Sequence, residues 1–111
     1  EMCIRDSIML SALDAEDPDK WPDQLHDYYI AKYYADEWLI HNTDLDYVIV
    51  QPTALTNDPA KGSITLQPQR PSTISRADVA DVLVAALDSN RHRDTVKIAS
   101  GNEAIVKALH V

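Results

Sequence analysis

Glycine is scarce in this chain of 111 residues, which contains only Gly62 and Gly101. Two glycines so far apart cannot form GxGxxG, nor GxxxxGK followed by Ser or Thr, the turns that hold the phosphates of dinucleotides and nucleoside triphosphates. The 111 residues therefore contain no glycine-rich phosphate-binding loop of their own.

Cysteine and long apolar runs are also scarce. Cys3 is the single cysteine, so these residues form no internal disulfide and no multi-cysteine zinc site, and they fit a reducing compartment. No apolar run approaches the roughly 20 residues that span a bilayer. Arg5, Asp6 and Ser7 interrupt the region where a signal peptide would be apolar. These features predict a cytoplasmic protein.

Basic residues are few relative to acidic ones, with 10 Lys and Arg against 18 Asp and Glu, for a formal net charge of -8. A surface of this sign repels phosphate backbones and anionic lipids, so we expect neither nucleic acid nor membrane as a partner. The four histidines show no HxH or HxxxH spacing. We therefore expect no metal site.

The first half of the chain predicts a strand, a helix and a second strand. Residues 8–10 form a short apolar run that ends at Ser11. Residues 28–40 contain neither Gly nor Pro, and Ile30, Tyr34 and Trp38 recur in them every four residues. This pattern predicts a helix, with Asp27 as its N-cap. The β-branched run 47–50 predicts a strand buried on both faces.

The second half continues the alternation. Residues 63–66 predict a short edge strand, and Ser75 with Asp78 predicts a helix N-cap at the start of an apolar helix that ends near Ser89. Residues 96–99 predict a further strand and residues 103–109 a closing helix. Alternating strands and helices predict an α/β fold with about three parallel strands, right-handed crossovers and flanking helices. So few strands suggest the second half of a larger α/β sheet.

One pair of side chains could carry chemistry. Tyr28 and Lys32 lie one turn apart on the predicted helix, and a nearby ammonium favours the ionised form of a phenol, which suits proton exchange with a substrate oxygen. Ser11 follows a predicted parallel strand, the place where α/β sheets put ligands. The alternative is a packed phenol beside a solvated ammonium, since YxxxK alone is common on amphipathic helices.

Several segments in consistent order resemble the atypical short-chain dehydrogenase/reductase proteins, in their NAD(P)-binding, NmrA-like group. They are IMLSALDAEDP, DYYIAKYYADEWLIHNTDLDYVIVQPTALTNDP, GSI, ISRADVADVLVAALD and IASGNEAI, which together span about residues 8–109. The resemblance implies the C-terminal half of a Rossmann-like doubly wound parallel sheet, with NAD(P) as cofactor and NADP preferred.

The resemblance also implies roles for individual residues. It gives Tyr28 the acid/base role, Lys32 the contact to the cofactor ribose and Ser11 the role of the family serine. The nicotinamide end of the cofactor would be lined by Gln51, Pro52, Thr53 and Leu55. Gln51 stands where arginine is common in the family, which removes a cation near the cofactor.

The resemblance begins at Ile8, so we place the domain at residues 8–111 and set residues 1–7 apart as a segment that a truncated or misassembled reading frame would explain. It implies an NAD(P)-dependent oxidoreductase or epimerase that uses hydride transfer. Two alternatives stay open, namely a sensor that binds NAD(P) without turnover and an inactive fragment. Because the glycine-rich half is absent from these residues, we expect the chain alone not to bind the cofactor tightly.

Overall fold

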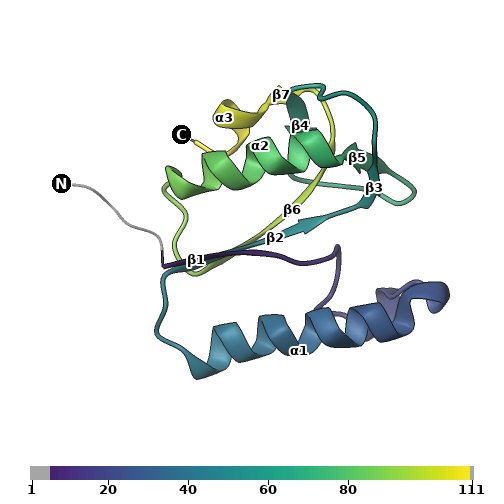
Figure 1. Cartoon of the computed structure of the whole chain (residues 1–111), viewed down its shortest axis with the longest axis vertical. Helices are drawn as coiled ribbons and strands as arrows, with labels where there is room; N and C mark the ends of the chain where they lie inside the picture. The colour runs from purple at the N-terminus through teal and green to yellow at the C-terminus, as the bar shows by residue number, and fades with distance from the viewer. Residues whose placement is uncertain (1–5, 111) are drawn as a thin grey trace.

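A five-stranded sheet forms the centre of the computed structural model, which describes residues 6–110 (Figure 1). Its strands, in spatial order, are β1 (Ser7–Leu10), β2 (Tyr47–Pro52), β6 (Asp94–Ser100), β4 (Ser63–Thr65) and β7 (Glu103–Ala104). The first three strands are parallel, and β4 and β7 extend the sheet in antiparallel pairings. The three predicted parallel strands are confirmed. The strand predicted at 63–66 also forms, as β4, but the prediction that it is an edge strand is wrong, because it lies between β6 and β7.

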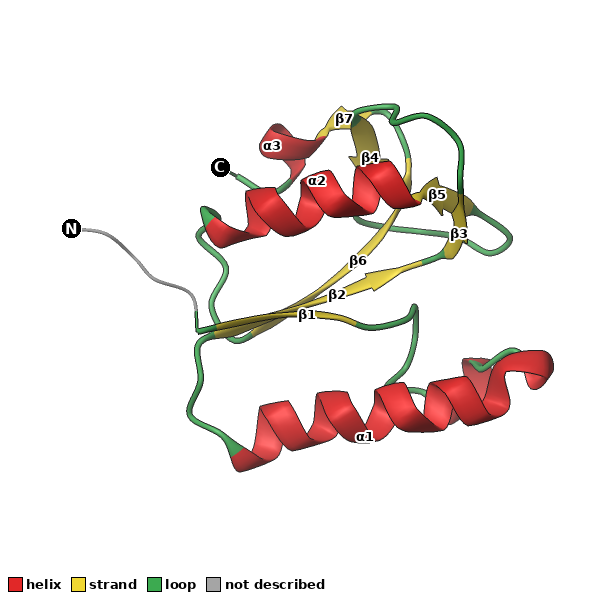
Figure 2. Cartoon of the chain, viewed as in Figure 1, coloured by secondary structure: helices red, strands yellow, loops and turns green. Residues whose placement is uncertain are grey.

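Helices cover both faces of this sheet (Figure 2). Helix α1 (His26–Asn42) lies on one face, and α2 (Arg76–Leu87) and α3 (Ile105–Ala108) lie on the other. Two short 3-10 helices, Pro18–Lys20 and Asp23–Leu25, precede α1, and β3 (Ala54–Thr56) pairs in parallel with β5 (Thr73–Ser75) in a small second sheet. This architecture confirms the predicted α/β fold, with parallel strands between two helical layers.

The two crossover connections have opposite hands. The chain moves in the same direction across the sheet from β1 to β2 and from β2 to β6, yet α1 and α2 lie on opposite faces. Two crossovers of the same hand would put both helices on one face. The prediction that both are right-handed is therefore wrong for one of them. The long segment between β2 and α2, which forms β3, β4 and β5, carries the chain to the second face.

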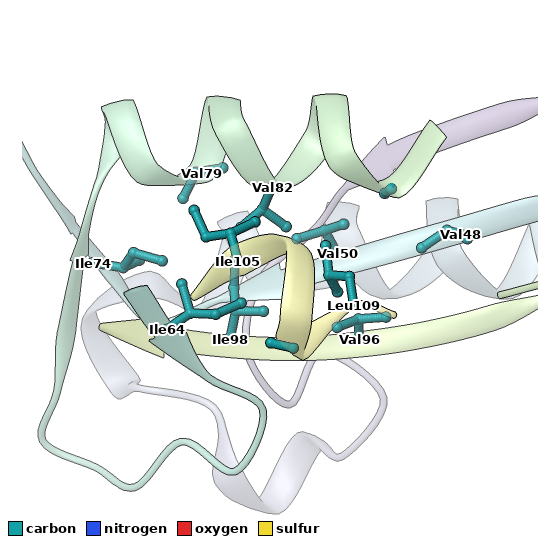
Figure 3. Packing of buried hydrophobic residues seen from close by; sticks show 12 residues of the cluster. Val48, Val50, Ile64, Ile74, Val79, Val82, Val96, Ile98, Ile105 and Leu109 are labelled. Atoms are coloured by element: carbon teal, nitrogen blue, oxygen red, sulfur yellow. The ribbon is translucent and has the colours of Figure 1, made fainter. Parts of the chain in front are cut away.

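The largest apolar core lies between the sheet and α2 (Figure 3). Val48 and Val50 of β2 face this core, where Val82 of α2 is among their fully buried neighbours. The intervening Ile49 joins a smaller cluster with Leu39 of α1 on the opposite face. Alternate residues of one strand thus anchor both helical layers, as expected for a strand buried on both faces.

Helix α1 differs from its prediction in its start and its buried face. Leu25 precedes the helix and Asp27 lies inside its first turn, so the predicted N-cap is wrong, because a 3-10 helix leads directly into α1. Tyr34 and Trp38 are 68% and 60% exposed, whereas Asp36 is buried on the same helix. The apolar periodicity failed because a buried carboxylate lies on the inner face and aromatic side chains lie on the outer one.

The start of α2 confirms its predicted cap. The Ser75 hydroxyl accepts a hydrogen bond from the Asp78 amide at 3.0 Å. The Asp78 carboxylate also accepts hydrogen bonds from the backbone amides of Lys61 and Gly62, at 2.8–3.1 Å. One buried side chain therefore fixes the loop before β4 to the first turn of α2.

The two ends of the described chain contain smaller differences. Asp6 and Ser7 both donate backbone hydrogen bonds to the carbonyl of Asp46, so the sheet begins before the predicted boundary at Ile8. The remainder of the predicted N-terminal segment, residues 1–5, lies outside the described residues. The predicted closing helix begins at Ile105, because residues 103–104 pair with β4 as β7. Within residues 6–110, no helix is long and apolar enough to cross a membrane.

Candidate active site

A cavity of about 310 Å³ lies where β1 and β2 end at their carboxyl sides. Its walls come from segments far apart in the sequence: residues 10–12, Pro22, Leu25, Tyr28, Tyr29, residues 52–55 and Arg70. Ligands of open α/β sheets bind at the carboxyl ends of parallel strands. The fold therefore offers one apolar hollow at the position where such a ligand would be expected.

Tyr28 and Lys32 meet at the edge of this cavity. Tyr28 lines the cavity from the first turns of α1 and is about half exposed. The Lys32 ammonium lies 5.4 Å from the centre of the Tyr28 ring and donates a hydrogen bond of 3.1 Å to the carbonyl of Leu10. One turn of helix thus places the cation beside the phenol, and the end of β1 fixes the cation.

Ser11 forms a buried pair with Asp36. The Ser11 hydroxyl donates to the Asp36 carboxylate at 2.6 Å, and both residues are at least 96% buried. Burial raises the pKa of the Asp36 carboxyl above its ordinary value, an effect that the hydrogen bond from Ser11 opposes in part. Asp36 lies one turn after Lys32, so the helix that carries Tyr28 also holds the serine.

A second polar group lies beneath the loop that follows β1. Gln51 accepts a hydrogen bond from the Asp14 amide and donates one to the Glu16 carboxylate. The Lys97 ammonium contacts Asp14 at 2.7 Å and Glu16 at 2.6 Å. These contacts join β2, β6 and the loop at residues 12–17, whose first residue, Ala12, lines the cavity.

The pKa values in this group follow from the ion pairs. Burial alone would raise the pKa of Glu16, but hydrogen bonds from Lys97 and Gln51 outweigh it and hold the pKa below the ordinary value. Burial would likewise lower the pKa of Lys97, and its bonds to Asp14 and Glu16 raise it instead. Glu16 and Lys97 therefore stay charged near neutral pH, and their ion pair holds the loop.

The structure brings together most of the residues that the sequence singles out. Five of them line the same cavity: Ser11, Tyr28, Pro52, Thr53 and Leu55. Lys32 contacts Tyr28 but does not line the cavity. Gln51 does not line it either: it is 1% exposed, and its amide contacts the loop rather than the hollow. Gln51 therefore supports the wall, and the predicted contact between Gln51 and the nicotinamide does not follow from this geometry.

Sequence reasoning missed two residues of the site, Asp36 and Arg70. Asp36 had a detectable signal, since it lies at i+4 from Lys32 and therefore on the same helix face. Arg70 had none, because it lies in a loop next to Pro71, with no periodicity that would place it. Its guanidinium reaches the carbonyl of Leu13 and the hydroxyl of Tyr29, 57 and 41 residues away in the sequence.

The fold and the position of the cavity define a nicotinamide dinucleotide-binding class of protein, and comparison with known proteins agrees. Residues 2–90 match the NAD(P)H-binding family, and the chain belongs to that family. It is 35% identical over 108 residues to YhfK of Bacillus subtilis, an uncharacterized sugar epimerase. This alignment covers 96% of the present chain and 50% of YhfK.

Two solved structures share the fold. The oxidoreductase YlbE of Lactococcus lactis is 36% identical with a TM-score of 0.88, over 93% of this chain and 49% of that one. A putative NAD-dependent epimerase/dehydratase of Bacillus halodurans is 33% identical with a TM-score of 0.86, over 93% and 50%. The chain thus spans about half the length of the relatives it matches, and it corresponds to part of the NAD(P)-binding domain of oxidoreductase- and epimerase-like proteins.

Proposed function

We propose that this chain forms the substrate-side half of an NAD(P)-dependent oxidoreductase or epimerase of the atypical short-chain, NmrA-like group. The observation that carries the proposal is that Tyr28 and Ser11 line one cavity while Lys32 lies against Tyr28. A phenol, a hydroxyl and an ammonium at the carboxyl ends of parallel strands are the groups that proton exchange with a substrate oxygen requires.

The cavity fits the nicotinamide end of the cofactor. Its volume of about 310 Å³ and its apolar walls, among them Leu10, Leu25 and Leu55, accommodate an aromatic ring beside Tyr28. When bound, the nicotinamide supplies the acceptor or donor of a hydride. Lys32 would hold the adjoining ribose, and Pro52, Thr53 and Leu55 would line the ring. The preference for NADP over NAD is part of the proposal, and titration with both cofactors tests it.

In this proposal Tyr28 exchanges a proton with the substrate oxygen while the hydride moves. In the reductive direction the Tyr28 hydroxyl gives its proton to the substrate oxygen, the oxidative direction is the reverse step, and the Lys32 ammonium lies beside the ring. When the Asp36 carboxyl is ionised, the Ser11 hydroxyl donates its hydrogen to it. The Ser11 oxygen can then accept a hydrogen bond from a substrate hydroxyl. A protonated Asp36 would release the Ser11 hydrogen for donation to a substrate carbonyl.

The net charge supports a further part of the proposal. With 18 acidic residues against 10 basic ones, we propose a small-molecule substrate and no nucleic-acid or anionic membrane partner.

Replacement of Tyr28 by Phe tests the function in a full-length protein made by joining this chain to the half of the B. subtilis relative that the alignment does not cover. We expect Tyr28→Phe to retain nicotinamide cofactor binding and to lose at least about a hundredfold in kcat against carbonyl or alcohol substrates, the usual contribution of a general acid or base. Absorbance of the reduced nicotinamide measures turnover, and calorimetry measures binding.

Tyr34→Phe is the matched control, since Tyr34 lies on the exposed face of the same helix. Equal turnover in the Tyr28→Phe, Tyr34→Phe and parent proteins would reject the catalytic role. Cofactor binding with no turnover in the parent would favour the sensor instead.

A further inference from the structure

Arg70 is the only formally charged side chain among the described residues that line the cavity. The remaining walls are apolar or carry neutral hydroxyl groups. The Arg70 side chain is 39% exposed, and its positive charge attracts an anion to a cavity whose other walls carry no charge. The positive charge of Arg70 therefore favours anionic ligands in this cavity.

Arg70 is fixed at the cavity wall by neutral groups. One guanidinium nitrogen, Nη2, donates to the carbonyl of Leu13 at 2.9 Å and to the hydroxyl of Tyr29 at 3.2 Å. Tyr29 is itself buried in α1. The guanidinium is thus held in place before any ligand arrives, which lowers the entropy lost on binding.

The nearby carboxylate leaves much of this positive charge available. The closest contact between Arg70 and Asp14 is 3.7 Å, from Nε. The other oxygen of Asp14 is engaged by Lys97 at the much shorter distance of 2.7 Å. Asp14 also lies outside the cavity walls. A ligand in the hollow therefore meets the guanidinium without meeting the carboxylate.

Two hydroxyl groups with no partner lie next to Arg70. A neighbouring hollow shares Thr53, Ala54, Pro22 and Arg70 with the cavity and is also lined by Ser72. Thr53 Oγ1 and Ser72 Oγ are buried and have no hydrogen-bond partner among the described residues. Thr53 is only 6% exposed. Buried hydroxyls are nearly always hydrogen-bonded, so these two unpartnered groups, on residues that line the hollows, leave hydrogen-bonding capacity for a ligand.

We infer that the cavity binds substrates with an apolar body and a carboxylate, and that Arg70, Thr53 and Ser72 hold the carboxylate where the two hollows meet. A planar guanidinium matches a carboxylate, and hydroxyl donors complete its hydrogen bonds. A single cation balances one negative charge. This inference rests on the proposed function, because it names the substrate class of the same site, with the apolar body beside Tyr28.

Benzoate and benzamide test the inference on the chain itself, since they have the same shape and differ in charge. We expect NMR titration to show benzoate binding at least about tenfold more tightly than benzamide, the size of one charge-assisted hydrogen bond. Arg70→Gln should remove this preference and leave benzamide binding unchanged. Arg76→Gln is the matched control, because Arg76 bonds to Asn57 and does not line the cavity.

Thr53→Val and Arg70→Lys keep the test decisive if Arg70→Gln does not fold. Thr53→Val should weaken benzoate severalfold without changing benzamide, and Arg70→Lys should keep part of the preference. Equal binding of benzoate and benzamide, or no binding of either, overturns the inference. Tighter binding of nicotinamide than of benzoate also overturns it, because this wall would then serve the cofactor carboxamide. The titrations contain no cofactor and no turnover, so their failure leaves the result for Tyr28 untouched.

Discussion

At the residue scale, the buried carboxylate of Asp36 is the least expected side chain of the site. It lies on the sheet-facing side of α1, where an apolar residue would ordinarily pack, and it accepts the hydrogen of Ser11. Its position costs stability, because burial disfavours the charged form. A cost of this kind beside a residue that lines a cavity, here Ser11, is typical of functional sites.

Asp36→Asn should stabilise the chain at neutral pH. The folded-state pKa of Asp36 is raised above 3.8, its ordinary value, so the folded chain binds the extra proton and stability falls as pH rises from about 3.8 through the folded-state pKa. Asparagine keeps an acceptor for Ser11 and carries no charge. Thermal unfolding from pH 3 to 8 should show a melting temperature above that of the parent near pH 7, with the gap closing below pH about 4.

Asp81→Asn on the exposed side of α2 controls for the loss of one negative charge. A gap for Asp36→Asn that is independent of pH, or a lower melting temperature at neutral pH, would show that burial does not dominate at Asp36.

At the element scale, Asp78 connects the loop before β4 with the first turn of α2. Its carboxylate accepts hydrogen bonds from the hydroxyl of Ser75, the N-cap of α2, and from the amides of Lys61 and Gly62. Burial alone would raise the pKa of Asp78, but these hydrogen bonds outweigh it and lower the pKa. The ionised carboxylate therefore stabilises the crossover segment and the helix start together.

Asp78→Ala should lower the free energy of unfolding by about 2–4 kcal/mol at neutral pH, since it removes the buried acceptor of several hydrogen bonds and each bond to a charged group contributes about 1.5–3 kcal/mol. Ser75→Ala, which removes the cap and one of the hydrogen bonds to the Asp78 carboxylate, should cost about 1–2 kcal/mol. The folded-state pKa is depressed, so this stability is present above 3.8 and is lost as pH falls through the folded-state value. Urea unfolding at pH 7 and pH 3 measures both effects, and equal losses at the two pH values would contradict the argument.

The same scale shows what could be predicted from the sequence. The β-branched run of β2 and the Ser75 cap are local signals, and both predictions were correct. The face of α1 was predicted wrongly, because the periodicity of Tyr34 and Trp38 does not reveal that the sheet accepts Asp36. The opposite hands of the crossovers depend on the path of residues 53–75. The pairing of Ser11 with Asp36 and the reach of Arg70 are tertiary contacts, and no local pattern encodes them.

At the scale of the whole molecule, the sheet has one extended side and one open side. Strand β4 pairs with β6 and β7 pairs with β4, whereas β1 pairs with β2 alone among the described strands. The relatives are about twice as long as this chain. The 111 residues form the cavity at the ends of β1 and β2. They contain no glycine-rich turn that would hold the phosphates of a dinucleotide.

The chain alone should therefore bind NADP only weakly. Without a helix N-terminus and glycine turn to hold the pyrophosphate, most of the binding energy of a dinucleotide is missing. Calorimetry should detect no complex with a Kd below about 100 µM, equivalent to roughly 5.5 kcal/mol. Joining the missing half should restore tight binding. A micromolar complex with the 111 residues would show that the phosphates have another site here.

The sheet separates the molecule into two sides with different tolerance to change. The core beneath α2 and the walls of the cavity share a single residue, Leu55. Two other wall residues, Ala12 and Tyr29, pack in a smaller buried cluster, and the remaining wall positions belong to no apolar cluster of the described residues. Ligand preference in such a protein can drift through many sequence changes while the fold keeps its stability, which makes the cavity walls a practical target for a saturation library.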